Sequence, residues 1–505
     1  MTGLPADGPG TESHQLLAGE STVMGVRTRV RGWLDLIPRS LSRLGLVERD
    51  SATEAFDLAV PAMVTGGLRI VLRVADFLFV GLALGDAAIG GLQIGFQYYF
   101  IGFGLSLALT SGTISVVSRL KGEGRNERAN LAVKQSLLLS TALAAPLTVA
   151  SWHYAEPMVA LLTDDPAVIG YGSAYLRVVM LSLGFRFYSM VAARALAGSA
   201  DTRTPMYVRL LTLPTNLLLN AVLVLGLGPF PALGVVGAAV GTAVANTLAS
   251  LIFIGLLVSG RHAVTLSAAR PHVDTGLSRE VVRVAAPLAG VRLLQSTARF
   301  PFIFILAALG TPALAAYAIG RRVMLLALMP AWGYATAAST LVGQAIGAGD
   351  RGGADNYAWQ TLRVGLATQA VLAVVLVVAA RPLALAFGTA YVDLTVDFIR
   401  VFGLVTAAYS VSRTMRGSLR GAGDTRWPLY AELLGSYLVR IPIAALALPA
   451  AVSISVAGVS VAPGLGLGYP AVFLAVVVDY YLKAAVNTGR FWSGKWWGVA
   501  QRANT

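Results

Sequence analysis

The sequence contains apolar stretches that are long enough to cross a lipid bilayer. About 20 predominantly apolar residues span the hydrocarbon core. One such stretch covers 234–259, and 365–380 is the core of another. The composition agrees, because 56% of the 505 residues are hydrophobic and only 13% are charged, against about 25% charged residues in a soluble domain. The sequence therefore predicts an all-α, polytopic membrane protein.

The hydrophobic runs predict twelve transmembrane helices. They lie at 55–83, 87–117, 128–152, 166–193, 204–227, 233–259, 280–309, 313–346, 356–380, 391–418, 427–450 and 466–488. Basic residues gather in every second connection, and only Arg381 is basic in the others. Lys and Arg collect in cytoplasmic loops, so membrane topology explains the net charge of +14 better than nucleic-acid binding does. We expect a plasma-membrane protein with both termini in the cytoplasm.

An internal repeat divides the chain into two halves. Residues 196–207 match 419–430 without gaps at seven of twelve positions, and 175–178 match 398–401 at the same spacing. Each half then carries six spans, which insert in the same orientation as a parallel repeat. The repeated turn is interpreted as structural, because its glycine ends one helix and its aspartate caps the next.

The predicted domains follow from this repeat and from the charged connections. A cytoplasmic N-terminal tail at 1–54 precedes an N-lobe of spans 1–6 at 55–260. A cytoplasmic linker at 261–280 leads to a C-lobe of spans 7–12 at 281–490. Residues 491–505 form a cytoplasmic C-terminal tail. The expected fold is thus two pseudo-symmetric bundles of six helices each.

Residue types that carry enzymatic or metal chemistry are scarce. The chain has no cysteine, and its four histidines are scattered without metal-ligand spacing. A phosphate-binding loop of the type Gly-x-x-x-x-Gly-Lys-Ser/Thr does not occur. We therefore expect no enzymatic activity, no catalytic residue, no metal and no cofactor.

The chain resembles the MATE (multidrug and toxic compound extrusion) family from about residue 55 to 490. The resemblance rests on Val60-Pro61, on Asp76-Phe-Leu-Phe-Val-Gly81, on 194–205 with its counterpart 416–428, and on Thr215-Asn-Leu-Leu-Leu-Asn220 followed by Gly226. It implies a V-shaped pair of lobes that exports small organic molecules or drugs in exchange for H⁺ or Na⁺ by alternating access. The expected partners are a small-molecule substrate and the lipid bilayer, and the expected state is a monomer.

Asp76 is the first candidate for ion coupling, because an ionisable group at membrane depth is a functional candidate by default. The resemblance implies that Asn216, Asn220 and Thr242 accompany it in a proton- or cation-binding site. The family has an acid where Asn220 stands here, so H⁺ is favoured over Na⁺ as the coupling ion. The alternative is that Asp76 only pairs with neighbours and holds helices together.

Two polar stripes predict the substrate cavity. Arg69, Arg73 and Asp76 share one face of the first span, and Arg292, Gln295 and Arg299 share one face of the seventh. Gln97 either lines the cavity or joins two helices by a hydrogen bond. Where the resemblance implies C-lobe acids, this chain has Gln295 and a position near Tyr409, so the C-lobe is interpreted as having lost its acids.

These stripes suggest that the cavity favours anionic or zwitterionic substrates, because unpaired charges in lipid cost several kcal/mol. Besides a drug exporter, two alternatives remain: an exporter of anionic metabolites and a lipid-linked precursor flippase of the same superfamily, although that branch commonly has two extra spans. A channel or receptor is less compatible with a two-lobed repeat and a lone membrane carboxylate.

Overall fold

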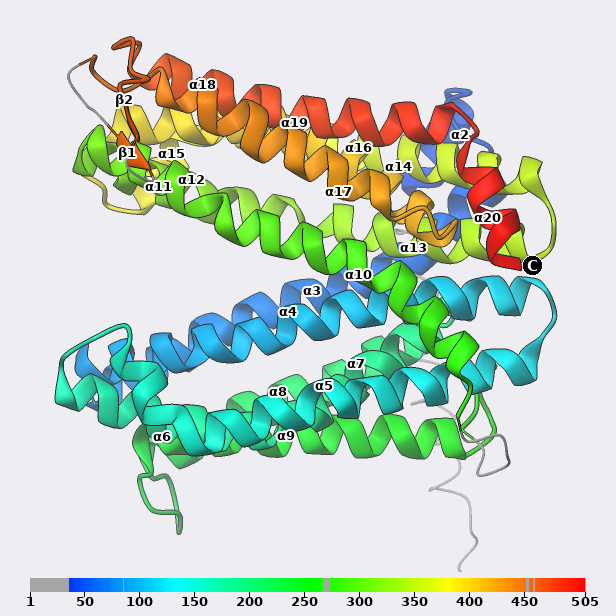
Figure 1. Ribbon diagram of the computed structural model, residues 1–505, viewed down its shortest axis with the longest axis horizontal. Helices are drawn as coiled ribbons and strands as arrows, with labels where there is room; N and C mark the ends of the chain where they lie inside the picture. The colour runs from blue at the N-terminus through cyan, green and yellow to red at the C-terminus, as the bar shows by residue number, and fades with distance from the viewer. Residues whose placement is uncertain (1–35, 85, 267–272, 451–453, 457–458, 505) are drawn as a thin grey trace, which may run out of the picture.

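The computed structural model describes residues 36–84, 86–266, 273–450, 454–456 and 459–504 (Figure 1). The side chains of 69–78 and 81–83 lie outside this description, as does most of the predicted N-terminal tail. In the N-terminal half the helices are α2 (Leu36–Arg43), α3 (Arg49–Leu84), α4 (Asp86–Gly122), α5 (Asn126–Ala160), α6 (Pro166–Leu181), α7 (Leu183–Gly198), α8 (Arg203–Leu225) and α9 (Gly234–Val258).

The C-terminal half is also helical. It contains α10 (Thr275–Thr297), α11 (Arg299–Ala308), α12 (Thr311–Ala327), α13 (Met329–Gly347), α14 (Arg351–Val378), α15 (Ala380–Ala386), α16 (Val392–Gly421), α17 (Arg426–Leu433), the π-helix η1 (Leu434–Arg440), α18 (Ile441–Ala445), α19 (Tyr469–Trp492) and α20 (Trp496–Asn504). Between α18 and α19, strands β1 (Ile454–Val456) and β2 (Val459–Val461) form a short antiparallel hairpin.

Within the described residues, eight helices or helix pairs are long and apolar enough to cross a membrane, and two bent pairs bring the number to ten. The pairs are α6 with α7, bent by 48°, and α12 with α13, bent by 47°. The predicted spans at 55–83 and 427–450 correspond to α3 and to the segment α17–η1–α18. At the bend between α6 and α7, the Ser182 hydroxyl donates a hydrogen bond to the Val179 carbonyl. The structure therefore agrees with twelve spans.

The helices form two bundles, the N-lobe (α3–α9) and the C-lobe (α10–α19). In Figure 1 the N-lobe is the lower bundle and the C-lobe is the upper one. The first span of each lobe lies between the bundles. α3 packs against α8 of its own lobe and α13 of the other, while α10 packs against α17 of its own lobe and α4 of the other. Because α10 and α17 repeat the roles of α3 and α8, the sequence repeat becomes a structural pseudo-two-fold relation.

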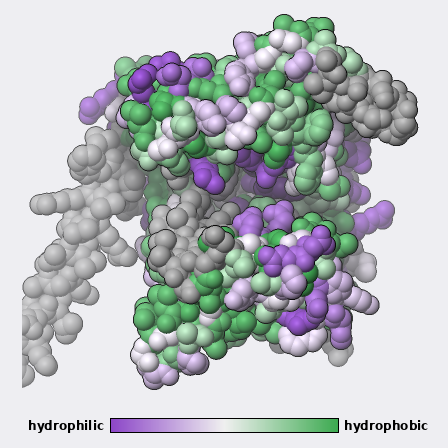
Figure 2. Space-filling model, turned by 90° about the vertical axis from the view of Figure 1, so that its left-hand side faces the viewer, coloured by the Kyte–Doolittle hydropathy of each residue, from purple (hydrophilic) through white to green (hydrophobic). Residues whose placement is uncertain are grey.

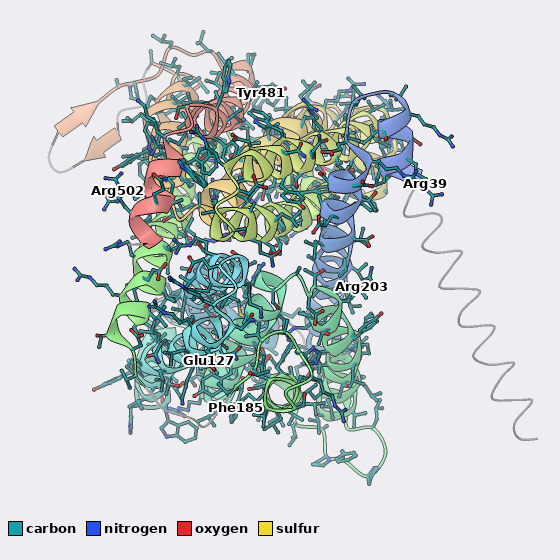
Figure 3. The ribbon with its side chains drawn as sticks, turned by 90° about the vertical axis from the view of Figure 1, so that its right-hand side faces the viewer. Arg39, Glu127, Phe185, Arg203, Tyr481 and Arg502 are labelled. Atoms are coloured by element: carbon teal, nitrogen blue, oxygen red, sulfur yellow. The ribbon has the colours of Figure 1, made fainter. Side chains whose placement is uncertain are left out.

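The two lobes meet in a closed seam at the end of the molecule that carries α2 and α20. The Ser115 hydroxyl donates to the Arg420 carbonyl at 2.6 Å, and the Thr340 hydroxyl donates to the Ala197 carbonyl at 2.8 Å. Thr340 is the repeat counterpart of Ser115, and Arg420 is the counterpart of Ala197. The contact is thus reciprocal, as in an interface between two copies of one surface. Figure 3 views this end, with Glu127 and Arg203 on one bundle and Tyr481 and Arg502 on the other.

Two glycines let the backbones approach within the seam. A Cβ added at Gly122 would lie 1.9 Å from the Gln344 carbonyl oxygen, and one at Gly347 would lie 2.0 Å from the Arg119 carbonyl oxygen. These contacts are again repeat counterparts. The segment before α3 is bound to α14, because Asn356 of α14 donates a hydrogen bond to the Glu48 carboxylate. Ser51 of α3 donates a second one, and together these bonds hold the pKa of Glu48 below its ordinary value.

At the opposite end the molecule is hollowed between the lobes. Figure 2 views this end and shows a recess between the upper and lower halves, with hydrophilic side chains visible inside it and hydrophobic ones on the flanks. A seam that is closed at one end and a recess that is open at the other give the V shape that the family resemblance implied.

The predicted C-terminal tail is partly a packed element. α20 folds back after α19, and its Trp496 is buried and stacks on Phe491 with ring centroids 4.9 Å apart. The same hydrophobic cluster includes Ile346 of α13 and Met415 of α16. This helix therefore covers the end of the C-lobe core.

A methyl group at Gly347 is expected to open the seam, because a Cβ cannot occupy the position of the Arg119 carbonyl oxygen. In double electron–electron resonance, spin labels on Leu161→Cys and Leu385→Cys, exposed sites at the recessed end, should move closer together in Gly347→Ala. The control is Gly255→Ala, where a Cβ meets nothing within 4 Å. Unchanged distances in Gly347→Ala would contradict the close backbone packing of the seam.

Candidate functional site

Three of the predicted ion-coupling residues lie together between α8 and α9. The Asn216 amide donates to the Thr242 hydroxyl at 3.4 Å, and the Asn220 amide donates to the Asn216 side-chain oxygen at 3.4 Å. Gly241 permits this approach, because a Cβ there would lie 2.0 Å from the Asn220 side-chain oxygen. The structure therefore brings these three residues to one buried polar site in the N-lobe.

Asp76 and Arg73 belong to α3, which packs against α8. Their side chains lie outside the described residues, so their predicted roles in coupling and in the cavity stay predictions. Gln97 of α4 is exposed, and its place in the substrate cavity likewise stays a prediction.

A second polar cluster of the N-lobe lies at the bend between α6 and α7. The Asn246 amide donates to the Tyr99 hydroxyl at 3.0 Å and to the Ser182 hydroxyl at 3.2 Å. Arg186 donates to the Asn246 side-chain oxygen at 3.5 Å and lies over the Phe103 ring. The charge of Arg186 inside a predicted span was a signal for this cluster, but its partners Asn246 and Phe103 lie on α9 and α4 and could not be identified from spacing.

The C-lobe contains a buried ionic network. Glu432 of α17 accepts hydrogen bonds from Lys483 at 2.7 Å, from Gln295 at 2.8 Å and from Ser436 at 2.8 Å. Lys483 also pairs with Asp479 at 2.8 Å. The two carboxyl residues are 1% and 0% exposed. The interpretation that the C-lobe has lost its acids is therefore wrong.

Two arginines complete this network. Arg416 of α16 reaches Glu432 at 3.4 Å, and Arg440 of η1 reaches Asp479 at 3.3 Å. Gln295, a predicted cavity residue, thus contacts an acid that is supplied by another helix. A sequence signal for this network lies in the last span, where Asp479 and Lys483 stand four residues apart on one helix face.

Arg292 and Arg299 flank Gln295 on the span formed by α10 and α11. Arg292 is half-buried and Arg299 is exposed. Electrostatic interactions relate Arg292 to Arg413 and Arg416, and Arg299 to Arg321 and Arg440. The predicted stripe of the seventh span therefore forms part of a larger basic region inside the C-lobe.

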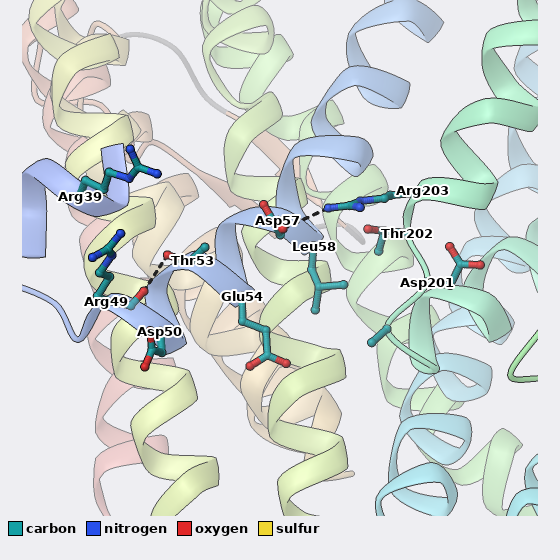
Figure 4. Close-up of a pocket in the computed structure, with 11 residues that line it drawn as sticks. Arg39, Arg49, Asp50, Thr53, Glu54, Asp57, Leu58, Asp201, Thr202 and Arg203 are labelled. Carbon is teal, nitrogen blue, oxygen red and sulfur yellow. Dashed lines mark hydrogen bonds and ion pairs between the residues drawn. The ribbon is translucent and has the colours of Figure 1, made fainter. Parts of the chain in front are cut away.

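A separate pocket of about 820 Å³ lies at the end of the molecule beside α2 (Figure 4). Both charge signs line it, and Arg203 pairs with Asp57 at 3.1 Å across it. The repeated turn forms one of its walls. There Asp201 accepts a hydrogen bond from the Thr204 amide at 2.9 Å, as a helix cap, and its counterpart Asp424 pairs with Arg490 at 2.7 Å. These contacts agree with the structural interpretation of the turn, and the pocket lies away from the recess between the lobes.

Removing the charge of Glu432 is expected to destabilise the protein, because Lys483 and Arg416 would keep a buried charge without its carboxylate. Breaking such a buried pair costs about 3–5 kcal/mol. The melting temperature of purified Glu432→Gln should therefore fall clearly. Asp393→Asn, which removes the exposed partner of Arg381, is the control and should leave the melting temperature nearly unchanged. Equal melting temperatures of Glu432→Gln and the unaltered protein would contradict the network.

Comparison with known proteins agrees with this architecture. The MatE family model matches residues 61–222 and 287–446, once in each lobe. A probable multidrug resistance protein NorM from Thermotoga maritima is 25% identical over 447 residues, which cover 88% of this chain and 92% of that protein. A FAD transporter from Shewanella oneidensis is 26% identical over 351 residues, which cover 69% of this chain and 76% of that protein.

A solved structure has the same fold. It is a MOP superfamily transporter from Pyrococcus furiosus, described as having a binding pocket whose reverse polarity suggests a different function. It superposes with a TM-score of 0.78 at 19% identity and covers 90% of this chain and 97% of that chain. The two-lobed, twelve-span fold predicted from the sequence is confirmed, and the chain belongs to the MatE family of membrane transporters.

Proposed function

We propose that the chain is a secondary active exporter that moves small organic molecules across the membrane by alternating access of its two lobes. The observation that carries this proposal is the pairing of a closed, reciprocal seam at one end with a recess between the lobes at the other. Parallel repeats of this kind rock about a central site. Two relatives described as a multidrug resistance protein and as a FAD transporter support an organic substrate.

The coupling ion is H⁺, and the N-lobe site holds it. Asp76 exchanges the proton, while Asn216, Asn220 and Thr242 provide uncharged oxygen and amide groups around it. A carboxylate suits this role because protonation replaces a charge with a hydrogen-bond donor, and this changes which contacts with neighbouring helices are favourable. The contacts of Asn216 with Thr242 and Asn220 support a preformed polar site at this place.

The orientation follows from the basic connections. The closed seam lies at the end with α2 and α20, where basic loops such as 119–128 also lie. Because Lys and Arg favour the cytoplasmic side, this end faces the cytoplasm of a plasma-membrane protein and the recess faces outward. One chain supplies both lobes, which supports a monomer as the working unit.

Proteoliposomes with an acidic lumen test this function. A proton-coupled exchanger should accumulate an organic dye inside as H⁺ leaves. Fluorescein and rhodamine 123, an anion and a cation that share one ring system, are both offered. Dissipating the pH gradient with an ionophore should abolish the accumulation of whichever dye is carried, and uptake of neither dye above protein-free liposomes would contradict the proposal.

Replacing Asp76 tests the coupling residue. Asp76→Asn cannot bind and release a proton, so gradient-driven uptake should fall by at least about tenfold, which equals ~1.4 kcal/mol. Asp164→Asn, an acid in the exposed connection between α5 and α6, is the matched control and should retain uptake. If Asp76→Asn keeps its full pH-driven uptake, the proton is carried elsewhere.

A further inference from the structure

Cationic side chains far outnumber carboxylates inside the C-lobe. The described cations of this basic region are Arg292, Arg299, Arg321, Arg413, Arg416, Arg420, Arg440 and Lys483. Electrostatic interactions connect Arg292 with Arg413, Arg416 and Arg420. They also connect Arg299 with Arg321 and Arg440, and at the seam Arg420 with Arg194 of the N-lobe. The carboxylates that pair with them, among the described residues, are Glu432 and Asp479. Among the described residues, the basic region thus contains eight cations and two acids that pair with them.

Both acids are already engaged. Lys483, Arg416 and Arg440 surround them. The remaining arginines have neutral partners: Arg413 donates to the Tyr409 hydroxyl at 2.7 Å, and Arg321 donates to the Tyr317 hydroxyl at 3.0 Å. These hydrogen bonds satisfy donors without cancelling charge.

Arg292 and Arg299 contribute to this excess of positive charge from the first span of the C-lobe. Neither forms an ion pair with any carboxylate in the part of the chain that the structure describes. They belong to the span 275–308, which lies between the lobes and packs against α4. Arg292 lies near the middle of that span, so its charge requires water or a counter-ion instead of a position at the membrane surface.

Aromatic rings stand beside Arg413, and one of them, Tyr409, also interacts electrostatically with Arg292. The Trp332 indole donates to the Tyr409 hydroxyl at 2.9 Å, and the Arg413 guanidinium lies 5.0 Å from the centre of the Tyr409 ring. Trp332 is 37% exposed, so its ring is available to a ligand. Guanidinium groups bind carboxylate and phosphate oxygens in pairs of hydrogen bonds, and aromatic faces accept a flat ring.

We propose that this basic region binds a small aromatic organic anion, with its carboxylate or phosphate held by Arg292 and Arg299 and its ring beside Trp332 and Tyr409. This inference rests on the proposed transport function and names its substrate class. The same charges repel organic cations, so the site selects by an unfavourable interaction as well as by a favourable one. Glu432 and Asp479 fix the arginines behind the site and leave its front face positive.

An anionic lipid headgroup offers the same oxygen chemistry. We assign the site to a soluble anion because its residues lie on the span between the lobes, and the recess there is lined by hydrophilic side chains (Figure 2). The experiment below separates the two sources by adding phosphatidylglycerol.

Equilibrium binding tests the inference without any gradient. Fluorescence anisotropy measures fluorescein and rhodamine 123 on the full chain purified in neutral detergent. Fluorescein should bind at least about tenfold more tightly than rhodamine 123, and Arg292→Gln or Arg299→Gln should weaken it by about tenfold or more, as expected for truncation of a desolvated charge contact. Arg292→Lys keeps the charge and should retain part of the affinity.

Arg283→Gln, an exposed arginine on the same helix α10, is the matched control and should bind like the unaltered protein. A size-exclusion profile identical to that of the unaltered protein shows that each variant is folded.

Tighter binding of rhodamine 123, no binding of fluorescein, or fluorescein binding that Arg292→Gln and Arg299→Gln leave intact would overturn the inference. Displacement of fluorescein by phosphatidylglycerol would reassign the site to a lipid headgroup. Fluorescein binding without gradient-driven uptake of either dye would leave the site standing and refute the transport function.

Discussion

The cost of holding charge at membrane depth is the constraint on which the rest of this structure depends. An ionisable side chain in the hydrocarbon costs several kcal/mol unless it meets a partner or water, yet the basic region of the C-lobe, among the described residues, holds eight cations and two paired acids. The helices therefore bring Glu432 and Asp479 into direct contact with Lys483, Arg416 and Arg440. Arg292 and Arg299, on the span between the lobes, form no ion pair with a carboxylate among the described residues.

The scaffold around this region is symmetric, but its contents are not. The seam repeats each contact, with Ser115 on the Arg420 carbonyl and Thr340 on the Ala197 carbonyl. At equivalent depth the N-lobe presents amides and a hydroxyl at Asn216, Asn220 and Thr242, whereas the C-lobe presents guanidinium groups. A repeated backbone thus fixes how the lobes meet, while the polar side chains inside each lobe differ.

The sequence predicts the backbone better than it predicts the C-lobe site. Hydropathy and the repeat locate all twelve spans, because a span is a local property of about 20 residues. The sequence placed Asn216, Asn220 and Thr242 in one candidate site, and the structure places the three side chains in contact, while their role in ion binding stays a prediction. The network around Glu432 and Asp479 could not be assembled from the sequence, because the partners of these acids come from α10, α16, η1 and α19. Which helix faces meet is decided by packing between spans, and spacing along one span cannot reveal it.

The central claim is that the space beside Arg292 and Arg299 is an anion site at membrane depth. Bromide reports this directly, because its anomalous X-ray scattering locates an anion without assuming the shape of a substrate. Crystals of the full chain soaked in bromide should show an anomalous peak between Arg292 and Arg299, and this peak should be absent from crystals of Arg292→Gln. Bromide peaks confined to the basic loops at the ends of the helices would contradict the account.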